Sequence, residues 1–143
     1  MNVATILKSK GRSVATARPE NTLLEIVSKL HAKRIGAIVI VGENGHVDGI
    51  VSERDVIRAI AEGGAAALLN PVSSAMTADV VSCQESNALD ELMELMTQGR
   101  FRHLPVMDDN SLVGIISIGD VVKNHIAEVE MEATSMRNYL ATG

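Results

Sequence analysis

The chain has 143 residues, of which 46% are hydrophobic and 22% are charged, and its formal net charge is −5. This composition indicates a folded globular protein, since disordered chains carry too few apolar residues to form a core. The negative charge argues against a general duplex-DNA binder, and one Phe and one Tyr are too few rings for a single-strand nucleic-acid platform. The single cysteine, Cys83, excludes an intrachain disulfide and a cysteine-rich metal site.

The N-terminus lacks the apolar run of a secretory signal. The longest apolar run, residues 37–41, is far shorter than the roughly 20 residues that cross a bilayer. We therefore expect a cytoplasmic protein with neither a membrane nor a nucleic-acid partner.

The chain contains a tandem duplication. Residues 13–41 align with residues 79–107 at an offset of 66, and residues 49–58 align with residues 114–123 at an offset of 65. A repeat of this length indicates that the fold consists of two similar units. The predicted organisation is an N-terminal segment, a first repeat, a linker, a second repeat and a C-terminal extension, at residues 1–12, 13–61, 62–78, 79–126 and 127–143.

Each repeat predicts the same element order, β-α-β-β-α, and hence an α/β fold. Asn21 and Asn87 are the expected N-caps of the first helices, because an Asn side chain accepts from the free N–H groups of a first turn. Neither repeat can cover a three-stranded sheet alone, so the two must pack together. The strands are expected at residues 14–16, 37–41 and 47–52, and again at residues 80–82, 103–107 and 112–117.

A long helix is predicted at the C-terminus, where apolar residues recur every three or four positions as in a heptad seam. It either folds back on its own domain or packs on a partner subunit, and we favour the partner. The N-terminal segment, with Val3, Ile6 and Leu7 at helical spacing, is expected to join that contact. The seam residues are Val122, Ile126, Val129, Ala133, Met136 and Leu140.

Both repeats carry the motif Gly-apolar-apolar-Ser-x-x-Asp at the end of a buried strand, which contains Ser52 and Asp55, then Ser117 and Asp120. Taken alone, Ser-x-x-Asp is typical of a helix-capping box. The same atoms suit a nucleotide, because a helix start binds phosphate and a carboxylate accepts the two hydroxyls of a ribose. The motif by itself does not distinguish between these two interpretations.

A basic pair, Arg102 and His103, begins the inner strand of the second repeat, where the first repeat has Gly36 and Ala37. An exposed strand edge explains such a pair, and so does phosphate recognition by the guanidinium fork. Arg54, in the first turn of a predicted helix, is expected to assist. The basic residues of the N-terminal segment form either a solvated face or an auxiliary phosphate contact: Lys8, Lys10 and Arg12.

The sequence offers little support for catalysis or for a metal. It contains no G-x-S-x-G, no P-loop and no G-x-G-x-x-G, and its four histidines show no ligand spacing. We therefore expect no enzyme activity and no metal. Cys83 is expected to be a small buried side chain, with a redox sensor as the alternative.

Three motifs in this order, GIVSERD (49–55), RHLPV (102–106) and GIISIGD (114–120), resemble the stand-alone tandem CBS-domain proteins of bacteria. The resemblance covers residues 13–60 and 79–126. It implies two units packed sheet to sheet about a pseudo-twofold axis, with two clefts, and pairs that dimerise. It also implies an adenosine-containing ligand, with AMP first and ADP, ATP, NAD(H) or S-adenosylmethionine as alternatives.

The resemblance assigns the ribose hydroxyls to Asp55 and Asp120, and a phosphate or ribose contact to Ser52 and Ser117. Each cleft takes its Ser-x-x-Asp from one repeat and its walls from the other, and Ile50 and Ile115 are the flanking apolar candidates. Around Asp55 the implied walls are Val80, Val81, Ser82, Arg102, His103 and Pro105. Around Asp120 they are Ser13, Val14, Thr16, Gly36, Ala37 and Ile38.

The expected function is a non-catalytic regulatory module that binds an adenosine nucleotide and signals the energy or redox state of the cell to an unidentified target protein. A homodimer through the CBS helices and the C-terminal helix is expected. The first alternative is a structural dimerisation or docking scaffold with vestigial clefts, and the second is a small hydrolase, which requires turnover. Because only the second repeat has the Arg-His pair, the two clefts are expected to differ, with weaker phosphate binding at Asp120.

Overall fold

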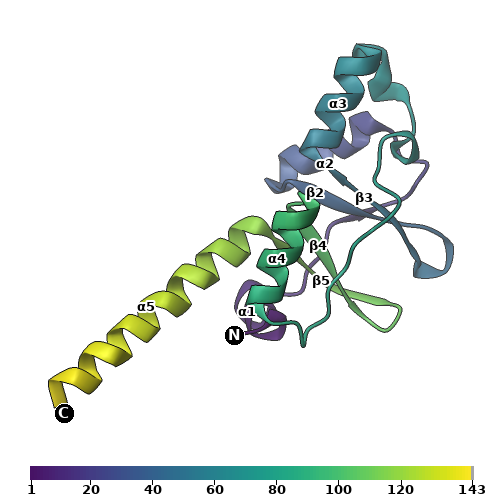
Figure 1. Ribbon diagram of the computed structural model, residues 1–143. Coiled ribbons are helices and arrows are strands. Elements are labelled where there is room, and N and C mark those ends of the chain that lie inside the picture. The colour runs from purple at the N-terminus through teal and green to yellow at the C-terminus, as the bar shows by residue number, and fades with distance from the viewer. Residues whose placement is uncertain (143) are drawn as a thin grey trace.

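Two small β-sheets, one from each repeat, form the centre of the structure, a computed structural model that describes residues 1–142 (Figure 1). The fold is mixed α/β. The first sheet has the order β1-β2-β3, with β1 parallel to β2 and β2 antiparallel to β3. In the second sheet β4 and β5 are antiparallel. The strands are β1 (Thr16–Ala17), β2 (Ala37–Val41), β3 (Val47–Ser52), β4 (His103–Asp108) and β5 (Ser111–Ser117).

The first strand of each repeat differs from the prediction. In place of the predicted strand at residues 14–16, the two-residue β1 begins two positions later. The predicted strand at residues 80–82 is replaced by one parallel bridge between Cys83 and Val106. The backbone of Cys83 exchanges hydrogen bonds with Pro105 and Met107, so this segment still lies against β4. A strand so short carries too few residues for a reliable sequence signal.

Residues 1–142 contain five α-helices, of which α5 projects away from the sheets, and short 3₁₀ turns lie in the first hairpin and the linker. The predicted N-terminal helix is present, and the linker contains a 3₁₀ turn at residues 65–69. The helices are α1 (Val3–Lys10), α2 (Leu23–Lys33), α3 (Glu53–Gly63), α4 (Leu89–Gly99) and α5 (Ile118–Thr142), and the turns are η1 (Glu43–Gly45), η2 (Ala65–Leu69) and η3 (Val72–Ser74).

The N-caps of α2 and α4 lie one residue after the predicted ones. Thr22 caps α2, with its hydroxyl accepting from the backbone N–H of Glu25 at 3.2 Å. Asn21 instead accepts from the backbone of Arg18 and donates to the Glu25 carboxylate. In α4 the N-cap is Ala88, whose backbone N–H donates to Glu91, so the side-chain half of the cap is missing. The Asn prediction was therefore wrong in both repeats.

Each repeat has its own apolar cluster, and each cluster is completed by a segment outside the repeat. The first contains Leu23, Ile38 and Val51 and is closed by Val72 of the linker. The second contains Leu92, Leu104 and Ile116 and is closed by α1, whose residues Val3, Ile6 and Leu7 are at most 1% exposed. The N-terminal helix therefore packs on the second repeat.

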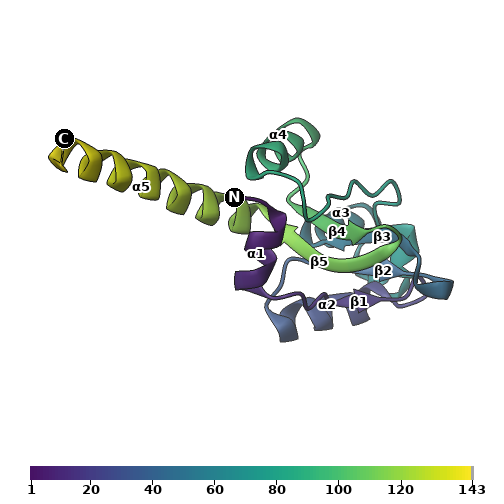
Figure 2. The same ribbon diagram turned by 90° about the horizontal axis from the view of Figure 1, so that it is seen from below.

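The two sheets also cover each other. Side chains alternate between the two faces of a strand, and Ile38 and Ile40 face the helices of the first cluster. Val39 faces the opposite side and is still fully buried, and Pro105 in β4 is also buried. The views in Figures 1 and 2 place β4 and β5 beside β2 and β3, so the face of each sheet away from its helices lies toward the other repeat.

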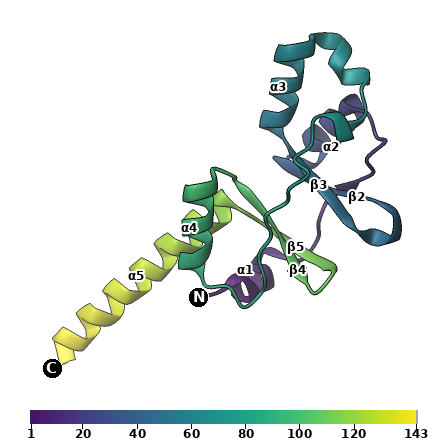
Figure 3. The same cartoon turned by 45° about the vertical axis from the view of Figure 1, so that its right-hand side comes forward.

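Helix α5 extends away from the rest of the fold in every view (Figure 3). It therefore does not fold back on its own domain, which was the first of the two interpretations of its seam. Five of the seam residues are between 49% and 69% exposed in this single chain: Val122, Ile126, Val129, Met136 and Leu140. Within residues 1–142, no helix has both the length and the apolar character needed to cross a membrane.

Candidate functional site

A cavity of about 560 Å³ lies where α3 begins, between the two repeats. It contains the first Ser-x-x-Asp motif, together with the end of the linker and the segment that leads into β4. This is the arrangement expected for a cleft built from both repeats. Its lining residues are Gly36, Ile50, Ser52, Glu53, Arg54, Asp55, Ile57, Arg58, Thr77, Asp79, Val80, Val81, Gly99, Arg100, Phe101, Arg102 and His103.

Asp55 is the one buried charged residue of the described chain, with 6% of its surface exposed. Its Oδ2 accepts from the backbone N–H of Ser52 at 2.9 Å and from the Ser52 hydroxyl at 3.2 Å. Its Oδ1 accepts from the guanidinium of Arg58, three residues later on α3. A buried carboxylate needs such partners, and the capping box predicted as the structural alternative is therefore present.

The cavity is rich in arginine. Arg58 pairs with Asp55, whereas Arg54, Arg100 and Arg102 form no ion pair with any residue that the structure describes. Glu53 and Asp79 are the acidic residues that line the cavity beside Asp55. Guanidinium groups present forked donors that match phosphate oxygens. The lining therefore offers donors for an anion beside a buried carboxylate.

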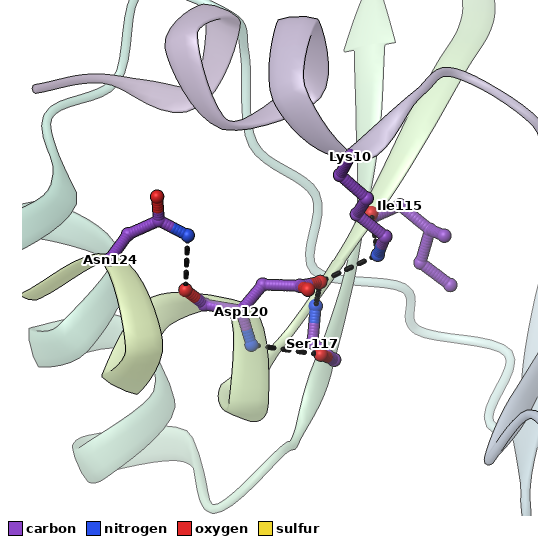
Figure 4. A network of polar contacts seen from close by, with 5 residues as sticks. All are labelled: Lys10, Ile115, Ser117, Asp120 and Asn124. Atoms are coloured by element: carbon purple, nitrogen blue, oxygen red, sulfur yellow. Dashed lines mark hydrogen bonds and ion pairs between the residues drawn. The ribbon is translucent and has the colours of Figure 1, made fainter. Parts of the chain in front are cut away.

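The second motif has different polar contacts from the first (Figure 4). Asp120 Oδ2 accepts from the backbone N–H of Ser117 at 2.9 Å, and the Asp120 N–H donates to the Ser117 hydroxyl at 3.1 Å. The ammonium of Lys10, at the end of α1, donates to the same Oδ2 at 2.5 Å and to the carbonyl of Ile115 at 2.7 Å. Burial alone would raise the pKa of Asp120, but these hydrogen bonds and the charge of Lys10 together lower it.

His103 lies between the two motifs. It lines the Asp55 cavity beside Gly36, and its electrostatic environment includes Lys10 and Asp120 of the second motif. Burial lowers the pKa of His103, Lys10 and Arg102 lower it further, and Glu53 and Asp120 oppose them. The neutral imidazole is therefore favoured, and it offers one donor and one acceptor.

Nine of the predicted site residues meet in the cavity: Gly36, Ile50, Ser52, Arg54, Asp55, Val80, Val81, Arg102 and His103. Gly36 was predicted for the other cleft. Ser82 is exposed and Pro105 is buried in β4, and neither lines the cavity. Ile115, Ser117 and Asp120 form the second motif around Lys10.

The remaining predicted residues, those implied as walls of the second cleft, do not line this cavity. Ser13 is exposed between α1 and β1, Val14 is half-buried there, and Thr16 pairs with Val39 in the sheet. Ala37 and Ile38 are buried within β2.

Sequence reasoning missed several lining residues. Arg58 had a signal, because it lies three positions after Asp55 on the same helix face. Arg100 and Phe101 directly precede the predicted Arg102, and Thr77 and Asp79 precede the predicted Val80. These residues could have been included by extending each predicted segment toward the N-terminus.

Cys83 is buried, with 3% of its surface exposed, in the core of the second repeat. Burial raises the pKa of its thiol to about 11, so the reactive thiolate is disfavoured. These properties fit the small buried side chain rather than the redox sensor. Among residues 1–142, no three His, Cys, Asp or Glu side chains are grouped as metal ligands.

Known proteins resemble this chain along most of its length. The CBS domain model matches residues 10–62 and 72–126. The mitochondrial CBS domain-containing protein CBSX3 of Arabidopsis thaliana is 30% identical over 149 residues, 99% of this chain and 72% of that protein. The CBS domain-containing protein YhcV of Bacillus subtilis is 36% identical over 115 residues, 80% of each chain.

Solved structures of the same fold include the CBS-domain containing protein ATU1752 from Agrobacterium tumefaciens, with a TM-score of 0.83 and 51% identity over 85% of this chain and 91% of that one. Two others, each 24% identical, bear on the fold alone. They are PAE2072 from Pyrobaculum aerophilum complexed with AMP (TM-score 0.75, 84% and 89% covered) and the CBS domain pair of MJ0100 with 5-methylthioadenosine and S-adenosyl-L-methionine (0.80, 90% and 98%). The duplicated units, their motifs and these matches together show that the chain belongs to the CBS domain family, as a tandem pair of CBS domains.

Proposed function

We propose that the cavity at the start of α3 binds an adenosine-containing nucleotide, with AMP as the first candidate, and that the chain is a non-catalytic regulatory module. The observation that carries this proposal is one buried carboxylate, Asp55, in the same cavity as three arginines without an ion-pair partner among the described residues. The volume of about 560 Å³ is typical of small-molecule sites. ADP, ATP and NAD(H) carry the same adenosine group and are alternative ligands of the same site.

In this proposal Asp55 holds the ribose. Its carboxylate already accepts three hydrogen bonds, two from Ser52 and one from Arg58. A carboxylate offers about four lone-pair sites, so it keeps capacity for a ribose hydroxyl without giving up the helix cap. The guanidinium of Arg58 forms an ion pair with this carboxylate and so compensates a buried charge.

The phosphate is proposed to bind the arginines, and the base to bind the apolar walls. Arg54, Arg100 and Arg102 supply always-charged, forked donors. Ile50, Val80, Val81 and Phe101 supply the apolar surface, and apolar side chains can sandwich a base with few aromatic rings. Two proteins of the same fold bind adenosine compounds, AMP in one and 5-methylthioadenosine with S-adenosyl-L-methionine in the other, which supports this ligand class.

We further propose that the chain acts as a homodimer that signals to an unidentified target protein in the cytoplasm. The exposed apolar seam of α5 supports a partner subunit, because a solvent-facing stripe of this length is typical of an interaction surface. A groove of about 940 Å³ between the start of α1 and α5, lined by Met1, Met131, Met136 and Tyr139 among others, extends the same face. Sedimentation at micromolar concentration tests the dimer, and a monomer would contradict it.

The nucleotide proposal is tested by calorimetry and thermal shift with AMP, ADP, ATP, NAD(H) and S-adenosylmethionine. A ligand at 100 times its Kd should stabilise the fold by about 2.7 kcal/mol. Asp55→Ala should weaken binding at least about tenfold, or about 1.4 kcal/mol. The matched control, Asp120→Ala, removes the equivalent carboxylate of the other repeat and should leave binding in the Asp55 cavity intact. No release of phosphate or adenosine is expected.

The second candidate function is a structural scaffold, which the exposed face of α5 favours without requiring any nucleotide. No stabilisation by any of these nucleotides at millimolar concentration, together with a stable dimer, would favour the scaffold. Equal affinity in the wild type and Asp55→Ala would also contradict the nucleotide proposal. Phosphate or adenosine release that disappears in Asp55→Ala would instead indicate a hydrolase.

A further inference from the structure

The carboxylate of the second motif is occupied by the chain's own N-terminal segment. Lys10 Nζ lies 2.5 Å from Asp120 Oδ2 and 2.7 Å from the Ile115 carbonyl oxygen, so one ammonium bonds both the motif's acid and the strand that precedes it (Figure 4). Ile115 and Asp120 are the residues that correspond to Ile50 and Asp55 of the cavity-lining motif. The ammonium therefore lies against the atoms that a ribose would use if the second motif bound one.

Lys10 is held in this position by the packing of its helix. Lys10 is the last residue of α1, and Val3, Ile6 and Leu7 of α1 are buried in the core of the second repeat. The helix stops directly after Lys10, because Gly11 has a φ of 103° and its N–H donates back to Leu7. The start of α1 also contacts α5, with the N-terminal ammonium 4.0 Å from Glu128.

The contact between Lys10 and Asp120 is partly exposed to solvent. The side chains of Lys10 and Asp120 are 32% and 23% exposed, so water reaches both groups and screens their attraction. In the first motif the cation on the acid, Arg58, comes from the same helix and leaves an open cavity beside Asp55. In the second motif the cation comes from a different helix and lies between the acid and the preceding strand.

We propose that Lys10 is an internal occupant of the second ribose site, so that the wild-type chain binds one nucleotide, at Asp55, and the Asp120 site opens only when the Lys10 ammonium is removed or displaced. This inference rests on the proposed function. It adds an autoinhibitory contact that makes the two repeats unequal and connects the second site to the N-terminal helix. The opposite role, in which Lys10 contacts the phosphate of a ligand at Asp120, predicts the reverse effect of removing it.

The test is calorimetry with AMP on the wild type, Lys10→Met and Lys8→Met. Methionine keeps the length and apolar stem of lysine but removes the ammonium, and Lys8→Met is the matched control from the same helix turn, where no contact with Asp120 is present. We expect one AMP per chain in the wild type and Lys8→Met, and a second AMP per chain in Lys10→Met. That second site should disappear in Lys10→Met with Asp120→Ala. If Lys10→Met fails to fold by circular dichroism, Lys10→Gln serves the same purpose.

A readout without ligand tests the contact itself. The carboxyl carbon of Asp120, followed by NMR, should titrate at a higher pH in Lys10→Met than in the wild type, and at an unchanged pH in Lys8→Met. Two AMP molecules in the wild type, one in Lys10→Met, or an unchanged titration of Asp120 would each overturn this inference while leaving the Asp55 proposal standing. Absence of AMP binding in every variant would overturn both.

Discussion

The two Ser-x-x-Asp motifs have the same local geometry and different surroundings. In both, the serine hydroxyl accepts from the aspartate backbone and the aspartate accepts from the serine backbone. Asp55 takes its cation from Arg58, three residues away, whereas Asp120 takes its cation from Lys10, which lies 110 residues away in the chain. Duplication therefore preserved the helix cap, and segments outside the repeats made the two sites different.

The same contrast runs through the cores. In the first repeat the linker crosses β3, where Ile50 pairs with Thr77, and it leaves Gly49 in contact with Met76. In the second repeat α1 occupies the equivalent place, and Leu7 lies against Gly114. The glycine of each motif is thus where a third segment approaches the strand, because no side chain intervenes.

The largest expected effect comes from truncating a side chain by which α1 fills the second core. Leu7→Ala should reduce the free energy of unfolding by about 2–5 kcal/mol, because Leu7 is 1% exposed and its loss leaves a cavity. Leu24→Ala, at a leucine of α2 that is 47% exposed, is the control and should cost about 0.5 kcal/mol or less. Urea denaturation measures both, and equal losses would show that α1 does not complete that core.

A smaller effect is expected at the two motif glycines. Gly49→Ala and Gly114→Ala should each lower the free energy of unfolding by about 1–3 kcal/mol, because the added methyl group overpacks a close contact. Gly49→Ala should cost more, because its new Cβ would lie 2.8 Å from the backbone oxygen of Thr77, whereas at Gly114 it would meet only the side chain of Leu7, at 2.7 Å. Urea midpoints of the two variants in parallel decide the order, and a larger loss at Gly114 would refute this account of the linker contact.

The caps of the equivalent helices α2 and α4 offer a third comparison. Thr22→Ala should lower the free energy of unfolding by about 1 kcal/mol, since it removes the side-chain acceptor at the N-cap of α2. Ala88→Thr should make the second cap like the first and stabilise the protein by a fraction of that amount. Thermal unfolding of both single variants checks the signs, and a destabilising Ala88→Thr would mean that the two caps are not interchangeable.

The smallest effect is a pH dependence at His103, which lies between the two motifs. Folding lowers the pKa of His103, so the unfolded chain binds the proton more readily than the folded chain. The contribution of neutral His103 to the free energy of unfolding is therefore complete above its ordinary pKa of 6.5. It is lost as the pH falls below that value. The charged groups that act on it are Lys10, Glu53, Asp120 and Arg102. His103→Gln should flatten this part of the stability profile in urea titrations between about pH 7 and pH 5, and an unchanged profile would exclude His103 as its source.

Much of the fold could be predicted because its signals are local or repeated. The strands β2 and β3 and the helices α1 and α2 follow from periodicity and turn residues. The misplaced elements were those without such a signal: the two-residue β1, the single bridge at Cys83 and the cap position beside Asn21. Asn21 is a good cap residue by type, but its amide was used by the preceding turn and by Glu25.

The candidate site was predicted in part. The motif indicated Ser52 and Asp55, and the resemblance to CBS-domain proteins implied that Arg102 and His103 lie in the same cleft; all four line one cavity. The contact between Lys10 and Asp120 could not be predicted from the sequence, because no pattern of local spacing relates the end of α1 to the start of α5. From the sequence alone, Lys10 is interpreted only as part of a solvated basic face or as a phosphate contact.

The sequence by itself determined the two repeated units, the helix and hairpin in each of them and the pair of helix-capping carboxylates, since each depends on interactions within a few residues. Only the tertiary structure decided which cation each carboxylate meets and which segment closes each core. These choices depend on where the linker and the N-terminal helix pack, and that packing is governed by the fit of apolar surfaces far apart in the chain.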